Sequence, residues 1–380
     1  NQHTYRTMKI GHSIFAILTF ICFTSYGQET VKENIVGKTI AIPSKIMGDV
    51  RTIQVYLPDG YDGSDKMYPV VYLLDGERYF LHGVSLHQTL VGFEQTPEFI
   101  IVGIAKNPSD RNRVYTVQSN KYLDFIEREI INYIETNFRT TEERLVFGWA
   151  FGGGFVFEAM VSNPSLFNGY IAASPFPLKN RIPRIDSLVR VCPNFDKFLY
   201  FSSETSEGRV REGAYELDSL LKKKPDNSIN WTFKELESEE HRSTPFTTLY
   251  HGLTRYFEYF PELQFNSLEA FKKAGGMAFV YNYYKNRASL YGFSEQPSDW
   301  TMFSLTRNAI RANNFEEFDV LVNEFESTHF MERIRLSRGC EIADFYLQHK
   351  QFEEGLKLFK LLAERHPDSE RPLLGLGNVY

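Results

Sequence analysis

The sequence has little cysteine, no Lys/Arg-rich block and, beyond its first thirty residues, no apolar run of membrane-spanning length. Three cysteines in 380 residues are too few for a disulfide scaffold. A net charge of −6 without a basic block argues against nucleic acid or an anionic membrane as a partner. The remaining composition, 42% hydrophobic and 24% charged, is typical of globular proteins, and the length allows more than one core.

The first thirty residues have the pattern of a secretory signal peptide. Met8-Lys9 begins a short basic stretch, an apolar run extends from Ile14 to Phe23, and small residues stand at Ser25 and Gly27. The run is shorter than the ~20 residues of a membrane span. We therefore expect residues 1–27 to be upstream sequence and a leader, cleaved after Gly27, and the protein to be periplasmic or secreted. Residues 1–7 would precede the start at Met8.

The cysteines leave two further points open. Lipidation at Cys22 is the weaker interpretation of the leader, because Ile21 is a poor residue before a lipidated cysteine. Removal of the leader would leave Cys192 and Cys340, one in each expected domain. A disulfide between them would suit an oxidising compartment, but nothing in their spacing supports it.

Short apolar runs alternate with amphipathic helical stretches between residues 36 and 262. The helical stretches are 120–138, 152–162 and 213–221, and the expected strands are 51–57, 69–74, 99–104, 144–147, 170–173, 198–201 and 231–236. This alternation is typical of a doubly wound α/β domain with a mostly parallel sheet. Ligands of such sheets bind beyond the carboxyl ends of the strands. The chemistry is therefore expected in the loops after Leu74, Phe147, Phe201 and Leu236.

From about residue 265 to 380 the pattern is helical throughout and contains a repeat. The residues at the spacing of a tetratricopeptide unit are Ile342-Ala343, Tyr346, Gly355, Phe359 and Pro367. Leu376-Gly377 and Tyr380 repeat the beginning of that unit after 34 residues, which is the tetratricopeptide period. We expect a tetratricopeptide-like region, truncated at Tyr380, that could bind a protein partner. A generic amphipathic helix pair is the alternative.

Residues 145–154 (LVFGWAFGGG) have the context of a nucleophile elbow. In the G-x-S-x-G elbow a strand leads through a tight glycine turn into a helix, and the central residue projects over the sheet edge. Here the central residue is Ala150, whose methyl group cannot attack a carbonyl. On this segment alone, a glycine-rich strand-to-helix turn without a catalytic role is an equal alternative.

Two later loops follow the chain order nucleophile, acid, histidine. The strand at 198–201 leads to Glu204, which we predict as the acid, with Glu207 as second choice. His241 lies before a helix expected to be capped by Ser243 or Thr244, with a proline in its first turn. Neutral imidazole would be the general base, and the acid would orient its other ring nitrogen. Taken singly, each of these side chains would more often be a solvated surface residue.

Together these segments resemble the putative esterase family, the esterase-D-like branch of the α/β-hydrolases, over residues 36–260. The matching stretches are Val55 to Pro58, Tyr68 to Gly76, the elbow, Asn163 to Phe167, Ala172 to Pro175, and His241 with Ser243 to Pro245. That branch includes feruloyl, acetyl-xylan and siderophore esterases and mycolyltransferases. The resemblance implies carboxylic-ester hydrolysis without a cofactor or metal, and an oxyanion hole made by the backbone amides of Glu77 and Phe151.

The alanine at the nucleophile position leaves three interpretations. The protein has lost catalysis and keeps a ligand pocket or a scaffold role, or its parent is a working esterase with a Ser→Ala change. In the third, Ser174 or a water activated by histidine does the chemistry. With the nucleophile lost, we expect this chain to be weakly active or inactive. A carbohydrate or siderophore ester would suit the site, and a tetratricopeptide scaffold is the alternative from another functional class.

Overall fold

The computed structural model describes residues 34–107, 111–192, 195–224 and 229–378. The predicted signal peptide, with Cys22, and the repeat position Tyr380 lie outside these residues. Within them, no helix is both long and apolar enough to cross a membrane. Cys192 and Cys340 are both free thiols.

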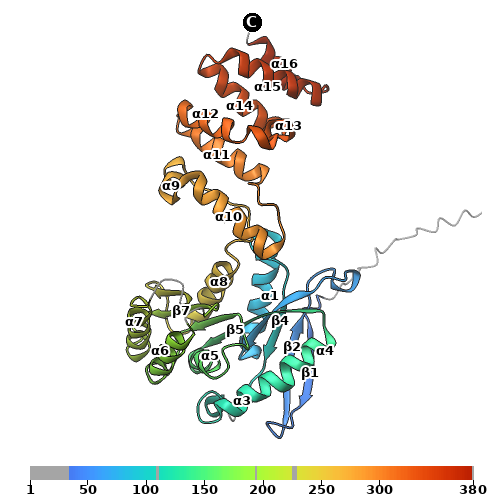
Figure 1. Cartoon of the computed structure of the whole chain (residues 1–380). Helices are drawn as coiled ribbons and strands as arrows, with labels where there is room; N and C mark the ends of the chain where they lie inside the picture. The colour runs from blue at the N-terminus through green and yellow to red at the C-terminus, as the bar shows by residue number, and fades with distance from the viewer. Residues whose placement is uncertain (1–33, 108–110, 193–194, 225–228, 379–380) are drawn as a thin grey trace, which may run out of the picture. The chain divides into compact units, whose positions relative to one another are not determined.

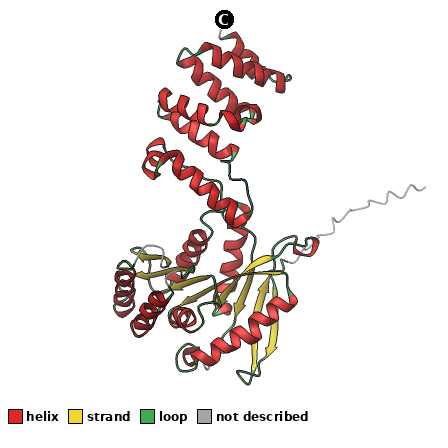
Figure 2. Cartoon of the chain, in the orientation of Figure 1, coloured by secondary structure: helices red, strands yellow, loops and turns green. Residues whose placement is uncertain are grey.

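The first part of the chain is built on one eight-stranded sheet, with the order β1-β2-β4-β3-β5-β6-β7-β8 (Figures 1 and 2). The strands are β1 Lys38–Pro43, β2 Val50–Tyr56, β3 Tyr68–Leu74, β4 Ile100–Ile104, β5 Thr140–Trp149, β6 Gly169–Ala173, β7 Phe198–Glu204 and β8 Asn230–Leu236. Strand β2 pairs antiparallel with both of its neighbours, β1 and β4. All the other neighbouring strands of the sheet pair parallel. The α/β prediction and its seven strands are confirmed. The edge strand β1 was missed because its residues are mostly exposed and it lacks an apolar run.

Alternate residues of the strands enter two cores on opposite faces of the sheet, as the pleat requires. In β3, Val70, Tyr72 and Leu74 face one core, while Val71 and Leu73 face the other. The first core is covered by α5 Phe151–Ser162, α6 Ile182–Val191, α7 Arg209–Leu221 and the helical stretch from 119 to 137. The second is covered by α1 Gly76–Gly92 and α8 Thr244–Tyr256.

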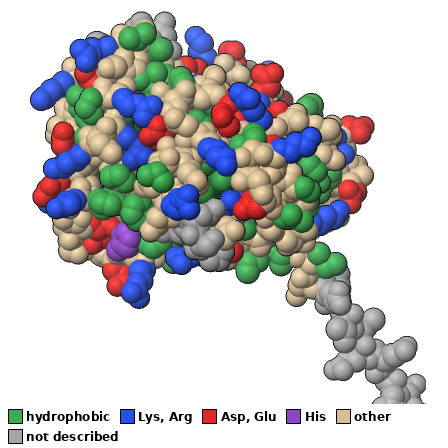
Figure 3. Space-filling model, turned by 90° about the horizontal axis from the view of Figure 1, so that it is seen from below, with side chains coloured by type: hydrophobic (Ala, Val, Ile, Leu, Met, Phe, Trp, Pro, Cys, Tyr) green, Lys and Arg blue, Asp and Glu red, His purple; other side chains and the backbone are tan. Residues whose placement is uncertain are grey.

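The helix predicted at 120–138 is present with an irregularity. It consists of α3 Ser119–Phe125, a π-helical turn at Ile126–Ile131 and α4 Asn132–Asn137. Shorter pieces are η1 Tyr61–Gly63, α2 Arg111–Val114 and η3 Lys179–Arg181. On the face seen in Figure 3, acidic and basic side chains of the described residues are interspersed, and neither sign forms one large patch.

The described residues after 265 are all helical with connecting loops, as predicted, and have a core of their own. The helices are α9 Leu268–Ala274, α10 Gly276–Tyr291, α11 Asp299–Arg311, α12 Phe315–Glu324, η4 Glu326–Thr328, α13 Phe330–Arg333, α14 Leu336–Gln348, α15 Phe352–Arg365 and α16 Glu370–Gly377. A Cβ at Gly355 would lie 3.2 Å from the carbonyl oxygen of Ala343, so α14 and α15 pack closely there. The assignment to tetratricopeptide repeats and a protein partner both stay predictions.

The core on the α1 side contains a buried histidine. His87 is 3% exposed and lies between the rings of Tyr56 and Phe99, with centroids 5.0 and 4.7 Å away. Its Nε2 accepts the backbone N–H of Phe99 at 3.3 Å, so the neutral ring carries its proton on Nδ1. Burial lowers the pKa of His87 to about 4, opposed in part by the charge of Asp59.

This histidine should make the α/β region sensitive to acid. Between pH 6.5, the ordinary pKa of the ring, and pH 4, the unfolded chain binds a proton that the folded chain does not. The free energy of unfolding should therefore fall by about 3 kcal/mol as pH drops through this range. Urea unfolding at pH 7, 5.5 and 4.5 measures the slope. We expect His87→Gln to flatten this slope and the matched surface variant His329→Gln to leave it unchanged. Equal slopes in all three proteins would refute the assignment of the acid sensitivity to His87.

Candidate active site

The elbow has the strained geometry that its sequence predicts. Ala150 lies between β5 and α5 with φ 52° and ψ −116°, a conformation that residues other than glycine rarely adopt. Its N–H donates to the carbonyl of Ala173 at 3.0 Å, and its own carbonyl accepts the N–H groups of Gly154 and Phe176, each at 2.9 Å. These three hydrogen bonds hold the strained residue in place from α5 and from the end of β6.

The glycines around Ala150 permit close packing of the strand, the helix and the next loop. A Cβ at Gly148 would clash with the carbonyl oxygen of Gly152, and one at Gly154 would clash with that of Phe176. A Cβ at Gly153 would lie 2.8 Å from the carbonyl oxygen of Ala173. The run of glycines is therefore a requirement of this turn.

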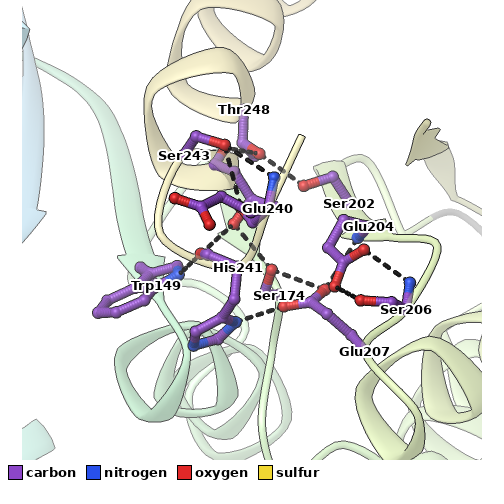
Figure 4. A network of polar contacts seen from close by, with 11 residues as sticks. Trp149, Ser174, Ser202, Glu204, Ser206, Glu207, Glu240, His241, Ser243 and Thr248 are labelled. Carbon is purple, nitrogen blue, oxygen red and sulfur yellow. Dashed lines mark hydrogen bonds and ion pairs between the residues drawn. The ribbon is translucent and has the colours of Figure 1, made fainter. Parts of the chain in front are cut away.

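A histidine and a glutamate meet beside the elbow (Figure 4). The Nδ1 atom of His241 contacts Oε1 of Glu207 within hydrogen-bonding distance. The other oxygen of that carboxylate, Oε2, accepts the hydroxyl of Ser174 and the N–H of Glu204, both at 2.9 Å. The side chain of Glu207 is 3% exposed, whereas that of His241 is 45% exposed. A buried carboxylate thus orients one ring nitrogen, and Nε2 stays on the side away from it.

Glu204, our first choice for the acid, does not occupy that position. Its carboxylate accepts the N–H of Ser206 at 2.6 Å and the hydroxyl of the same residue at 2.7 Å. It is turned back onto the loop after β7, and only its backbone contacts Glu207. The carboxylate that contacts the imidazole is that of Glu207, our second choice, which lies past the turn and just before α7.

Trp149, which was not among the predicted site residues, holds the loop of His241. Its indole N–H donates to the carbonyl of His241 at 2.9 Å, and the two rings lie 4.7 Å apart at 38° (Figure 4). Because Trp149 precedes Ala150, the histidine loop is attached next to the elbow. Ser243 stands at the N-cap position of α8 as expected, but its hydroxyl bonds to the N–H and carbonyl of Glu240 instead of capping the helix.

The amides of Glu77 and Phe151 lie at the amino ends of two helices. Helix α1 starts at Gly76 and α5 at Phe151, directly after the parallel neighbours β3 and β5. The first N–H groups of a helix have no acceptor within it and carry partial positive charge. Both helix ends are therefore suited to stabilise an oxyanion at this edge of the sheet. The carboxylate of Glu77 is bound to Lys106, at 3.1 Å from its N–H and 3.3 Å from Nζ.

Ser174, the alternative nucleophile, is fully buried and its hydroxyl is bound to Glu207. Its hydroxyl is therefore directed at the acid. Throughout the part of the chain that the structure describes, no group of three or more His, Cys, Asp or Glu side chains is arranged to hold a metal ion.

Comparison with known proteins agrees with this geometry. The model of the family described as "Putative esterase" matches residues 44–229. Over these residues the α/β part of the chain is similar to the putative esterase family. An uncharacterized protein of Bacillus subtilis, YbbA, is 25% identical over 258 residues, which are 63% of this chain and 95% of the relative.

Solved structures of two hydrolases share the fold. The IroE-like serine hydrolase of Shewanella oneidensis is 25% identical, with a TM-score of 0.56 over 76% of this chain and 98% of its own. The siderophore hydrolase EstA of Aspergillus nidulans is 18% identical, with a TM-score of 0.53 over 61% of this chain and 99% of its own. Because EstA is only 18% identical to this chain, the similarity between them shows the fold alone.

Proposed function

We propose that this chain is an ester-binding member of the esterase family whose catalytic groups are all in place except the nucleophile. It would bind carboxylic esters in the periplasm or outside the cell and hydrolyse them weakly or not at all. The observation that carries the proposal is the conformation of Ala150 beside the His241–Glu207 pair. Backbone strain of this kind costs ~1–3 kcal/mol and is typical of functional sites.

The residues have distinct roles in the proposed chemistry. The ester carbonyl would lie over Ala150, with its oxygen toward the amides of Glu77 and Phe151. With serine at position 150, Nε2 of His241 would remove the hydroxyl proton, and Glu207 would stabilise the resulting imidazolium through Nδ1–H. With alanine there, no acyl-enzyme can form, because the methyl group has neither a proton to give nor a lone pair.

Aromatic side chains near the elbow support an aromatic ester as ligand. The ring of Tyr79 lies 6.4 Å from that of Trp149 and 6.3 Å from that of Phe246, whose side chain is half exposed. Tyr79 and Trp149 are buried, so Phe246 is the ring of this group that a flat ligand would reach. The siderophore hydrolase and the serine hydrolase with the same fold are consistent with a siderophore or related aryl ester.

Covalent labelling tests the proposal directly. A fluorophosphonate probe should label the Ala150→Ser variant at residue 150, because the probe reacts with a serine that a histidine activates. The chain as it stands and the Ala150→Ser/His241→Ala double variant should both stay unlabelled. Labelling at another residue, or none in a folded Ala150→Ser protein, would refute the proposed site.

A further inference from the structure

A buried hydroxyl chain lies behind the His241–Glu207 pair. Ser174 follows β6, is 0% exposed and has φ 43°. Its N–H donates to the carbonyl of Ser202 at 2.9 Å, which joins it to β7. Its hydroxyl donates to Oε2 of Glu207 at 2.9 Å and lies 2.8 Å from the hydroxyl of Thr244 (Figure 4).

The direction of the hydrogen bonds follows from the charge of the acid. An ionised carboxylate only accepts, so the single proton of the Ser174 hydroxyl is directed to Glu207. The hydroxyl of Thr244, the first residue of α8, can then donate to Ser174 or to the carbonyl of His241, which lies 3.1 Å away. The chain of hydroxyls thus contacts Glu207 through Ser174 and the backbone of His241 through Thr244. Glu207 and His241 are the two residues that must stay aligned.

We propose that Ser174 is a positioning residue that holds Glu207 against Nδ1 of His241. This inference rests on the proposed function. Glu207 lies in the loop between β7 and α7, so regular secondary structure does not fix its side chain. Without Ser174, Oε2 would retain only the N–H of Glu204 as a donor. The left-handed backbone of Ser174 is a second local strain, as expected where a side chain must be aimed at one place.

The kinetic test uses Ala150→Ser as the reference enzyme. Adding Ser174→Ala should lower kcat by about 10- to 100-fold, the range for one hydrogen bond to a charged group, with little change in KM. Ser202→Ala is the matched control. That serine is also fully buried, but its hydroxyl bonds to Thr248 at 2.5 Å and not to the acid. The kcat of the Ala150→Ser/Ser202→Ala protein should stay within about threefold of that of Ala150→Ser.

A double-variant comparison separates positioning from general loss of structure. In a protein that already carries Glu207→Gln, Ser174→Ala should cause little further loss of kcat, because residues that act as a unit are not additive. Ser174→Gly, which tolerates φ 43° better, should be at least as stable as Ser174→Ala and equally slow. Additive losses, or recovery of kcat in Ser174→Gly, would overturn the inference.

A spectroscopic test needs no activity. In the chain with Ala150, the proton between Nδ1 of His241 and Glu207 should give a low-field resonance in ¹H NMR of ring-¹⁵N-labelled protein. Ser174→Ala should shift or broaden this resonance, and Ser202→Ala should not. If Ala150→Ser proves inactive, the proposed function fails, but this measurement still decides the inference: an unchanged resonance in Ser174→Ala would refute it.

Discussion

Ala150→Ser should raise kcat/KM toward small aryl esters by between about 10³- and 10⁶-fold over the chain as it stands. The range follows from the cost of removing the nucleophile of a serine hydrolase, while the oxyanion hole and binding retain some acceleration. The added hydroxyl would sit on a backbone already held in the required conformation by three hydrogen bonds. The measurement is the rate of release of nitrophenol from its acetyl ester, with feruloyl and siderophore-type esters in parallel.

The stability of the Ala150→Ser protein is measured alongside its activity, because an unfolded protein would also be inactive. Ala150 is 8% exposed at a turn, so one hydroxyl should change the free energy of unfolding by about 1 kcal/mol or less. The Ala150→Ser/His241→Ala protein should lose most of the gained rate. A folded Ala150→Ser protein that hydrolyses none of these esters would show that the site has changed beyond its nucleophile, and a purely ligand-binding role would then be favoured.

Glu207→Gln should nearly abolish the activity gained by Ala150→Ser, with kcat falling by about 10⁴-fold. Replacement of a triad carboxylate by an amide has an effect of this size, because the histidine is then held in the wrong tautomer. The reason applies here because Glu207 contacts Nδ1 and its side chain is almost entirely buried. The measurement is kcat of the Ala150→Ser/Glu207→Gln protein on the same aryl ester.

Glu204→Gln is the matched control, since it makes the same chemical change three residues earlier, at the end of β7. Its carboxylate bonds to Ser206 and not to the imidazole, so kcat should fall by less than about tenfold. If Glu204→Gln were the more damaging change, the acid of the working enzyme would be Glu204, and the pairing seen in the structure would not be the catalytic one.

Much of the site could be predicted because its signals are local in the chain. The elbow is a contiguous stretch, and each of its glycines has a steric reason within the turn, so both the strained position and its occupation by Ala150 were predictable. His241 was found in the same way, by its place between a strand and a proline-containing helix start. Most of the strands were recognisable as apolar runs, and β3, β4, β6 and β7 are buried along their whole length.

Only the tertiary structure decided which side chains meet. Glu204 ends β7 and Glu207 follows three residues later. The choice between them depends on the turn before α7 and on Ser174 and His241, which are distant in sequence. For the same reason Ser174 was considered only as an alternative nucleophile, because a serine after a buried strand gives no sign of the carboxylate it will bind.

The sequence by itself therefore determined the fold class, the strained strand-to-helix turn at Ala150 and the place of His241 before α8, because each depends on neighbouring residues and their periodicity. The tertiary structure decided which carboxylate contacts His241, the hydrogen bond from Ser174 to that carboxylate and the burial of His87 between rings from different elements. Each of these depends on the directions of side chains brought together across strands, and a one-dimensional pattern does not contain those directions.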